Sequence, residues 1–244
     1  MTRLRAPPIV NCLPIAIPKT IIDLHSTTIL STDHLFIQYI LFLYTISRGY
    51  EFRTIDHSNR KKATKEDMED GIKKVINVYR SRGIHVHTIN TCNKFEYIKK
   101  TIQLVHLNVI VAKEHVSDVE RSTRTVEEGT RGDIQRLPHT HYLRVIVRGC
   151  VIKRVKDLNQ LPSNNEMSTE LSPTTLLAGN PSPDFLQVIN LNFEDFAHSY
   201  NAIKIYNTPK SRVVRVLVLY PSGNEGSWWI FMPLATGREI HRNK

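Results

Sequence analysis

Three β-rich runs follow one another early in the chain, and helical and strand-like patterns alternate after them. The runs cover about residues 29–37, 40–47 and 50–55, and Ser47-Arg-Gly49 is predicted to form a tight turn before the third. Consecutive strands joined by short turns predict an antiparallel meander. The alternation that follows predicts helices packed against an extension of the same sheet.

The first helix follows a polar, lysine-rich link at residues 57–65. Its apolar side chains fall on one helical face, at Met68, Ile72, Val75, Ile76 and Tyr79. The segment Ile84–Ile89 then alternates between apolar and polar residues, as a strand does. A short helix over residues 95–102 and a strand over residues 108–112 continue the pattern. The predicted order is therefore β-β-β-α-β-α-β-α, and the last helix of this order follows the strand at residues 108–112.

That last helix is predicted to start near Ser117, which has Glu120 three residues later, the spacing of a capping box. Glu120 has two interpretations. It can cap the helix and compensate its dipole. Alternatively it is a carboxylate held beside the sheet, with Arg121 and Arg124 on nearby turns, suited to hold a metal ion next to phosphate. The spacing alone does not choose between them.

Asp33 lies inside the first β-rich run, next to Thr32 and close to Leu35 and Phe36. A carboxylate within a buried strand is costly unless it is paired or bound to a metal ion. The alternative is an edge strand on which Asp33 faces water. Asp33 is thus the second candidate site residue.

The charge balance points to a polyanionic partner. Lysine and arginine number 33 against 23 acidic residues, a net charge of +10. The segment from Arg121 to Lys156 alone holds nine basic and three acidic residues. It is either a solvated surface or a phosphate-binding stripe. The candidate nucleic-acid-binding residues are Arg121, Arg124, Arg131, Lys153 and Arg154. Residues 143–155 are β-branched and ambiguous between helix and strand.

The three cysteines argue against a disulfide scaffold or a zinc knuckle. Cys12, Cys92 and Cys150 are odd in number and widely spaced, without a Cys-x-x-Cys pair. This usage fits a reducing, intracellular compartment. Prolines interrupt residues 1–18, which excludes a signal peptide, and the apolar run at 35–46 is far short of the roughly 20 residues that span a bilayer.

The remaining segments predict a leader, a linker and a small β module. Residues 1–27 are predicted to be an extended leader, and residues 159–184, rich in Asn, Ser, Pro and Thr, a linker. Strand-like runs at 204–206, 213–220 and 228–231 predict a small β-rich module over residues 185–244. Its Trp228 and Trp229 either pack in its core or stack on bases. Residues 28–158 form the main domain.

Several short motifs, in order and at characteristic intervals, resemble the integrase core of copia-type LTR retrotransposons from roughly Pro18 to Lys244. They are Ser31-Thr-Asp33, Thr45-Ile-Ser-Arg48, Phe52-Arg-Thr54, Phe95-Glu96, Glu114-His-Val116 with Glu120-Arg121 and Arg124-Thr125, Leu171-Ser-Pro173 with Gly179, and Thr236-Gly-Arg238. The resemblance implies a ribonuclease-H-like mixed sheet flanked by helices, an α/β (α+β) fold, with a small C-terminal β module. For residues 143–155 it implies a helix.

In that family three carboxylates hold two divalent ions, Mg²⁺ or Mn²⁺, which drive 3′-end processing and DNA strand transfer. Asp33 matches the first carboxylate and Glu120 the third. Three residues before Phe95, where the second is expected, this chain has Cys92. A thiolate is a poor magnesium ligand. The resemblance therefore implies a degenerate copy with impaired or absent catalysis.

The function predicted from the resemblance is that of an integrase-like, DNA-binding protein of a retrotransposon, nuclear or cytoplasmic. Its partners would be the retroelement ends and a target duplex, and a homo-oligomer is compatible with this role. Asp33 and Glu120 would be the metal ligands, and Cys92 would occupy the second catalytic position. The alternative is a non-catalytic nucleic-acid-binding or interaction protein derived from a transposable element.

Overall fold

The structure is a computed structural model, and it describes residues 15–57, 64–100, 102, 105–110, 117–137, 142–162, 167–168, 170–179, 193–200, 213–222 and 228–243. The chain divides into two compact units. The larger comprises Ile15–Pro183, and the described residues of the smaller fall within Asp184–Lys244. Among the described residues, no helix has both the length and the apolar character needed to cross a membrane.

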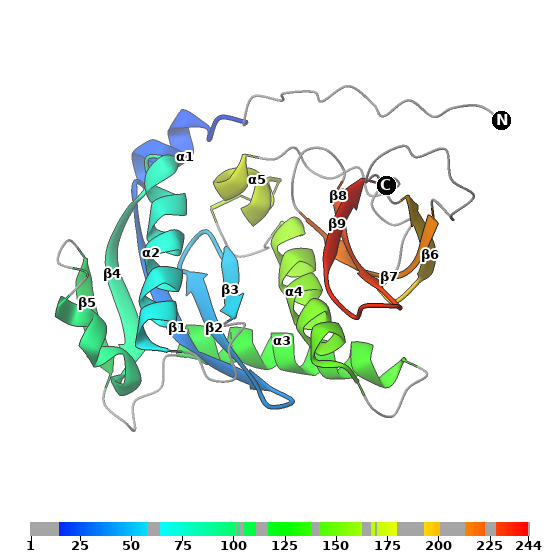
Figure 1. Ribbon diagram of the computed structural model, residues 1–244. Coiled ribbons are helices and arrows are strands. Elements are labelled where there is room, and N and C mark those ends of the chain that lie inside the picture. The colour runs from blue at the N-terminus through cyan, green and yellow to red at the C-terminus, as the bar shows by residue number, and fades with distance from the viewer. Residues whose placement is uncertain are drawn as a thin grey trace. The chain divides into compact units, whose positions relative to one another are not determined.

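The larger unit is built on a five-stranded sheet in the order β3-β2-β1-β4-β5 (Figure 1). The strands are β1 (Thr27–Ile37), β2 (Ile40–Ser47), β3 (Arg53–His57), β4 (His85–Cys92) and β5 (His106–Ile110). The first three pair antiparallel, and β4 and β5 run parallel to β1. A meander extended by parallel strands on the side of its first strand is the ribonuclease-H-like arrangement. The predicted fold class is confirmed.

The turn between β1 and β2 is set by local backbone geometry. Gln38 and Tyr39 both have positive φ values, 44° and 65°, as a two-residue type I′ hairpin requires. This turn type matches the right-handed twist of the strands it joins and fixes the β1–β2 register. In that register Asp33 is the Cα partner of Tyr44. Residues paired in this way project from the same face of the sheet.

One face of the sheet is covered by α2 (Lys65–Ser81). Thr64 caps this helix in a capping box with Asp67. Its buried apolar residues are those predicted from the periodicity, namely Met68, Ile72, Val75, Ile76 and Tyr79. The short helix predicted at 95–102 is the 3₁₀ helix η1 (Asn93–Lys100), whose Phe95 and Ile98 reach the same core.

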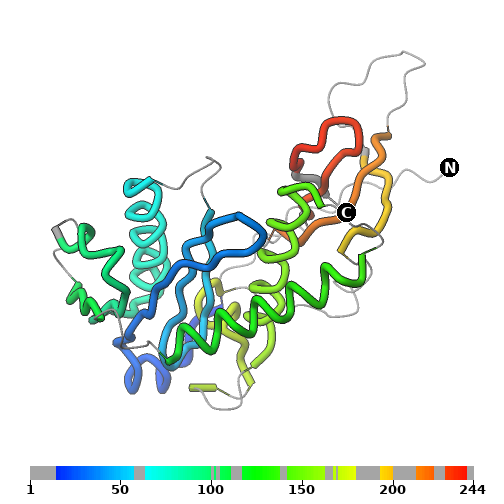
Figure 2. The backbone as a smooth tube through the Cα atoms, turned by 90° about the horizontal axis from the view of Figure 1, so that it is seen from below, coloured from blue at the N-terminus to red at the C-terminus, as the bar shows by residue number. Residues whose placement is uncertain are grey.

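The opposite face carries α3 (Ser117–Gln135), which contacts β1 and β2, while α4 (Arg144–Gln160) packs on α3 and β3. Figure 2 shows α3 running along the sheet on the side away from α2. Residues 143–155, ambiguous in sequence, thus belong to a helix. Ser117 is the first residue of α3 and not its N-cap, and Glu120 lies in its first turn.

The segments predicted as a leader and a linker each contain a short helix. Within the leader predicted for residues 1–27, Lys19–Leu24 form α1. Within the linker predicted for residues 159–184, Pro173–Ala178 form α5, capped by the Ser172 hydroxyl, which accepts from the amide of Thr175. Leu176 and Leu177 of α5 are buried in the core of the larger unit. This part of the predicted linker therefore packs as part of the larger unit, because apolar burial outweighs the polar composition.

The smaller unit is a four-stranded antiparallel sheet in the order β6-β7-β8-β9. Its strands are β6 (Phe196–Tyr200), β7 (Val213–Pro221), β8 (Trp228–Pro233) and β9 (Ile240–Asn243). Val216, Val218, Trp229 and Phe231 form its core. The predicted C-terminal β module is confirmed, and Trp229 is a core residue. The strand predicted at 204–206 lies outside the described residues.

Candidate active site

The candidate site lies where β1 and β4 stop pairing. Their parallel ladder ends at Thr32 and Thr91, whereas β1 continues along β2 to Ile37. Asp33 is the first residue of β1 beyond that ladder, and Cys92 is the last residue of β4. Because this edge of β1 has no strand beside it, side chains from either face of the strand can converge around it.

Three side chains converge at this edge. A carboxylate oxygen of Asp33, an imidazole nitrogen of His34 and Sγ of Cys92 all lie within 4.8 Å of one another, and all three residues are partly exposed. Asp33 Oδ1 accepts the backbone N–H of His34 at 2.7 Å. The Cys92 thiol thus lies beside the Asp33 carboxylate. The two positions that the sequence singled out, Asp33 and Cys92, are therefore neighbours in space.

His34 was not among the residues predicted from sequence. Its ring stacks on the fully buried ring of Phe95, with centroids 4.5 Å apart and planes 23° from parallel. This stacking fixes the imidazole beside Cys92. The available sequence signal was a second ionisable residue directly after Asp33, within a β-rich run.

The surroundings favour the uncharged forms of His34 and Cys92. Burial lowers the pKa of His34, and the nearby Lys94 lowers it further, while Asp33 opposes both. Burial also raises the pKa of the Cys92 thiol, and the nearby Asp33 carboxylate raises it further. The backbone N–H of Lys94 acts in the opposite direction and lowers this pKa. At neutral pH the imidazole of His34 is therefore neutral and the thiol of Cys92 is protonated.

Glu120, the third predicted catalytic residue, does not belong to this cluster. It lies in the first turn of α3, two residues before Ser122, whose hydroxyl contacts Tyr44 on the strand next to Asp33. The start of α3 therefore lies on the face of the sheet from which Asp33 projects. Among the described residues, no other group of three or more His, Cys, Asp or Glu side chains brings its ligand atoms this close together.

A buried polar network lies next to the cluster, between the sheet and helices α3 and α4. The hydroxyls of Tyr44 and Ser122 are 2.5 Å apart, and Arg53 Nε donates to Ser122 Oγ at 3.1 Å. Asn159 Oδ1 accepts the backbone N–H of Arg53 at 2.9 Å, and its Nδ2 donates to the Arg53 carbonyl at 2.7 Å. Burial raises the pKa of Tyr44 to about 12, so its hydroxyl stays protonated.

The five predicted nucleic-acid-binding residues have different surroundings. Arg121, Arg124 and Arg131 are exposed on α3. Lys153 is partly buried on α4 and forms an ion pair with Asp157 at 2.6 Å. Arg154 lies against α3 at Gly129, and its Nε is buried and has no hydrogen-bond partner in the described part of the chain. The three arginines of α3 are therefore the most accessible of the five.

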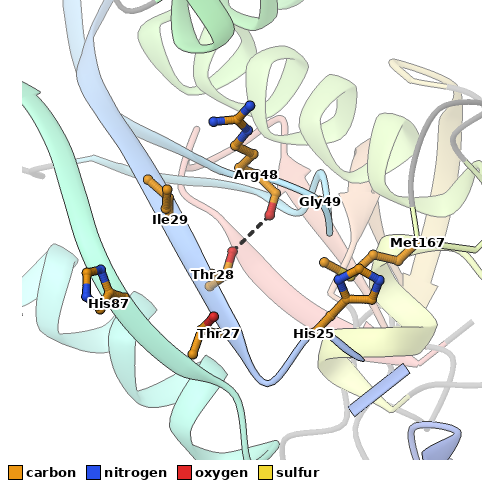
Figure 3. A pocket seen from close by; sticks show the side chains of 8 residues that line it. All are labelled: His25, Thr27, Thr28, Ile29, Arg48, Gly49, His87 and Met167. Carbon is orange, nitrogen blue, oxygen red and sulfur yellow. Dashed lines mark hydrogen bonds between the residues drawn. The ribbon is translucent and has the colours of Figure 1, made fainter. Parts of the chain in front are cut away.

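A pocket of about 580 Å³ lies away from the cluster, at the amino-terminal ends of β1 and β4 (Figure 3). It is lined by Thr27, Thr28, Ile29 and His87, with His25, Arg48, Gly49 and Met167 completing its wall. The Thr28 hydroxyl donates to the carbonyl of Arg48 at 2.9 Å. None of the predicted site residues lines this pocket, so the pocket and the predicted site are different places on the sheet.

No protein-family model matches the chain, and no curated protein matches its sequence. Among solved structures it is similar to the HTLV-2 integrase catalytic core domain in complex with magnesium, in a trimeric form. The two share 14% identity over 61% of this chain and 95% of that one, with a TM-score of 0.41.

Two further structures are similar at the same level. One is the simian T-cell lymphotropic virus intasome in complex with the PP2A regulatory subunit B56 gamma, with 13% identity, 88% and 75% coverage of the two chains and a TM-score of 0.43. The other is the catalytic core domain of BIV integrase, with 11% identity, 62% and 93% coverage and a TM-score of 0.42. At such distances the fold assignment rests on the strand order and pairing of this chain.

The side chains present do not fit the two-magnesium centre implied by the resemblance. Mg²⁺ prefers oxygen ligands in near-octahedral geometry. The cluster offers one carboxylate, one imidazole and one thiol, and Glu120 is not part of it. Nitrogen and sulfur donors suit softer or borderline ions instead. Chemically, the cluster is a mixed-donor site at the edge of a sheet.

Proposed function

We propose that this chain is an integrase-like, DNA-binding protein of a retrotransposon whose active site no longer supports two-metal strand transfer. The observation that carries the proposal is the thiol of Cys92 beside the Asp33 carboxylate. The resemblance expects the second carboxylate of a DDE centre at that place. The ribonuclease-H-like strand order supports the same assignment, because the central strands β1 and β4 carry the two residues.

Loss of catalysis follows from the donor set. Two-metal transfer depends on anionic oxygens that hold both ions against the attacking and leaving groups. A protonated thiol supplies no such oxygen, and the third carboxylate, Glu120, lies outside the cluster. We therefore expect 3′-end processing and strand joining to be severely impaired or absent.

DNA binding is supported by charge and by exposure. Arg121, Arg124 and Arg131 are exposed on α3 at spacings of three and seven residues, so they lie near one outward side of the helix. The chain also carries a net charge of +10. Cations arranged in this way bind the phosphate backbone without reading base sequence.

A catalytic assay compares the parent protein with Cys92→Asp. Nicking and strand joining of a labelled duplex are measured with Mg²⁺ and with Mn²⁺. The proposal expects little or no activity from the parent and more from the Cys92→Asp protein, because one of the missing oxygen ligands has been restored. Activity in the parent that Glu120→Ala abolishes would show that the site is not impaired.

A binding assay tests the arginines of α3. Replacing Arg121, Arg124 and Arg131 together by Gln is expected to weaken duplex binding and to reduce the slope of log K against log salt by roughly 0.9 for each lost contact. The matched control replaces Lys73, Lys74 and Arg80 by Gln on α2, on the opposite face of the sheet. Equal losses in both triple variants would contradict a binding surface on α3.

A second candidate is a non-catalytic nucleic-acid-binding or interaction protein derived from a transposable element. The position of Glu120 outside the Asp33 cluster favours it. Under this alternative Cys92→Asp stays inactive, while both proteins bind DNA with the same salt dependence and without added metal.

A further inference from the structure

We propose that Asp33, His34 and Cys92 form a binding site for one zinc-class divalent ion. This site does not depend on the proposed DNA function. Its three donors are of different kinds, an oxygen, a nitrogen and a sulfur, and all lie within 4.8 Å of one another. Zinc takes all three of these ligand types in proteins.

The spacing is close to that of a tetrahedral centre. Zinc–ligand bonds of roughly 2.0 to 2.3 Å place tetrahedral ligand atoms roughly 3.3 to 3.8 Å from one another. The cluster, with an upper limit of 4.8 Å, needs only small side-chain rotations to close around an ion. Three protein ligands leave the fourth position for water, and the partial exposure of all three residues leaves room for it.

Two of the donors are held in place by their surroundings. Asp33 Oδ1 accepts the amide of its neighbour His34 at 2.7 Å, which orients the carboxylate. The ring of His34 is held against Phe95 by stacking. Because β1 and β4 are the central paired strands of the sheet, the backbones that carry the donors are also fixed.

The adjoining rung carries two further polar groups. Thr32 Oγ1 and Thr91 Oγ1 are buried and have no hydrogen-bond partner within the described residues. These threonines form the last β1–β4 pair and directly precede Asp33 and Cys92. Because side chains alternate along a strand, the two hydroxyls project from the face opposite to the Asp33 carboxylate, so they add no ligand to the cluster.

Lys94 acts against metal binding. Its charge lies close enough to lower the pKa of His34, so it also repels a cation held by the cluster. Replacing Lys94 with Gln is therefore expected to tighten metal binding. A surface site that gathered metal adventitiously elsewhere would not respond in this way.

The experiment titrates Co²⁺, a spectroscopic substitute for zinc, into the full-length, metal-free protein. Because Cys12 lies outside the described residues, all variants carry Cys12→Ser. We expect one Co²⁺ per chain, a near-ultraviolet thiolate-to-cobalt band, visible bands of tetrahedral intensity, and displacement by Zn²⁺ but not by Mg²⁺. Cys92→Ser and His34→Gln should each weaken binding by at least about 100-fold.

Matched controls separate this site from other donors. Cys150→Ser removes the other described thiol, which is buried in α4, and His87→Gln removes a histidine at the other end of β4. Both should bind Co²⁺ like the parent. Cys92→Asp should keep the visible bands and lose the thiolate band, because it replaces one ligand by another.

Three results would overturn the proposal. They are a thiolate band that survives in Cys92→Ser, no band in a parent protein that is folded by circular dichroism, and equal loss of binding in His87→Gln and His34→Gln. Each variant's unfolding in EDTA is compared with that of the parent, so that a lost band is not mistaken for misfolding. None of these readouts involves DNA, so failure here is distinguishable from failure of the proposed function.

Discussion

Two polar regions lie next to each other on the same sheet and use their side chains differently. Between the sheet and helices α3 and α4, the side chains of Tyr44, Arg53, Ser122 and Asn159 hydrogen bond to one another or to the backbone. At the edge of β1, the cluster of Asp33, His34 and Cys92 brings unlike donors together while remaining partly exposed. The first region joins elements of the fold, and the second presents its donors to solvent.

The difference follows from burial. Ser122 and Asn159 are 5% exposed and Tyr44 is fully buried. An unpaired polar group at such positions would cost as much as a lost hydrogen bond, so the network has to be closed. The cluster lies where a ladder ends and solvent reaches the strand edge, so its donors are not required to satisfy one another. Such an edge can keep a ligand site on a rigid scaffold.

The largest predicted effect is on the network. Asn159→Ala removes both side-chain bonds to the backbone of Arg53 and leaves the partly buried N–H and carbonyl of Arg53 without that partner. At about 1 to 2 kcal/mol for each group, we expect the free energy of unfolding of the larger unit to fall by about 3 kcal/mol. Denaturant unfolding measures the loss, and hydrogen exchange at the Arg53 amide should accelerate in parallel.

Two controls sharpen the contrast with the cluster. Asn159→Asp keeps an acceptor for the Arg53 amide and should recover part of the stability. Cys92→Ser, measured in EDTA, should cost less than about 1 kcal/mol because the residue is partly exposed and no buried backbone group loses a partner. If Cys92→Ser were as costly as Asn159→Ala, the cluster would be part of the structural core and the contrast would be wrong.

Sequence patterns predicted those features that depend on local periodicity. The face of α2 and the three-stranded meander repeat every few residues, so single-sequence patterns identify them. Residues 143–155 stayed ambiguous because α4 buries side chains around much of its circumference, including the adjacent pairs Ile146–Val147 and Cys150–Val151. No single apolar stripe marked that segment as a helix.

The candidate site was predictable only in part. Asp33 and Cys92 came from motif positions, and the structure brings them together. His34 was missed because its role depends on where the β1–β4 ladder ends and on a ring three residues beyond Cys92, and neither is local to Asp33. The surroundings of Arg154 were hidden for the same reason, since they depend on how α3 crosses α4.

Lys156 lies on α4 near the network, and replacing it is expected to raise the free energy of unfolding, whereas replacing Asn159 lowers it. Burial lowers its pKa from 10.5 to about 8. The charged form is therefore disfavoured in the folded protein, and below pH 8 the full cost of burying the charge is present. Lys156→Met should raise the free energy of unfolding at pH 7 by on the order of 2 to 3 kcal/mol.

The pH dependence checks the cause. Between pH 8 and 10.5 the folded protein binds fewer protons at Lys156 than the unfolded chain, so the parent gains stability relative to Lys156→Met as pH rises. The difference between the two proteins should shrink across this range and be smallest near pH 10.5. A difference that is constant from pH 7 to 10.5 would mean that the methionine acts by packing and that the charge costs nothing.

The smallest predicted effect compares two glycines of α3. A Cβ at Gly132 would meet no atom within 4 Å, so Gly132→Ala should stabilise the helix by up to about 1 kcal/mol. A Cβ at Gly129 would overlap Arg154 Nε and come within 2.6 Å of its Cζ. Gly129→Ala should therefore be less stable than Gly132→Ala by about 1 kcal/mol or more, because Arg154 has to leave its packed position.

Removing the arginine separates steric overlap from helix propensity. In an Arg154→Ala background, Gly129→Ala should become as stabilising as Gly132→Ala, giving a coupling between positions 129 and 154 in a double-mutant cycle. Arg154 Nε is buried without a hydrogen-bond partner among the described residues, so it does not belong to the closed network beside it. If no coupling is measured, the packing of Arg154 across Gly129 contributes nothing to the α3–α4 contact. The guanidinium could then turn outward at no cost, and Arg154 would join the arginines of α3 as a DNA-binding candidate.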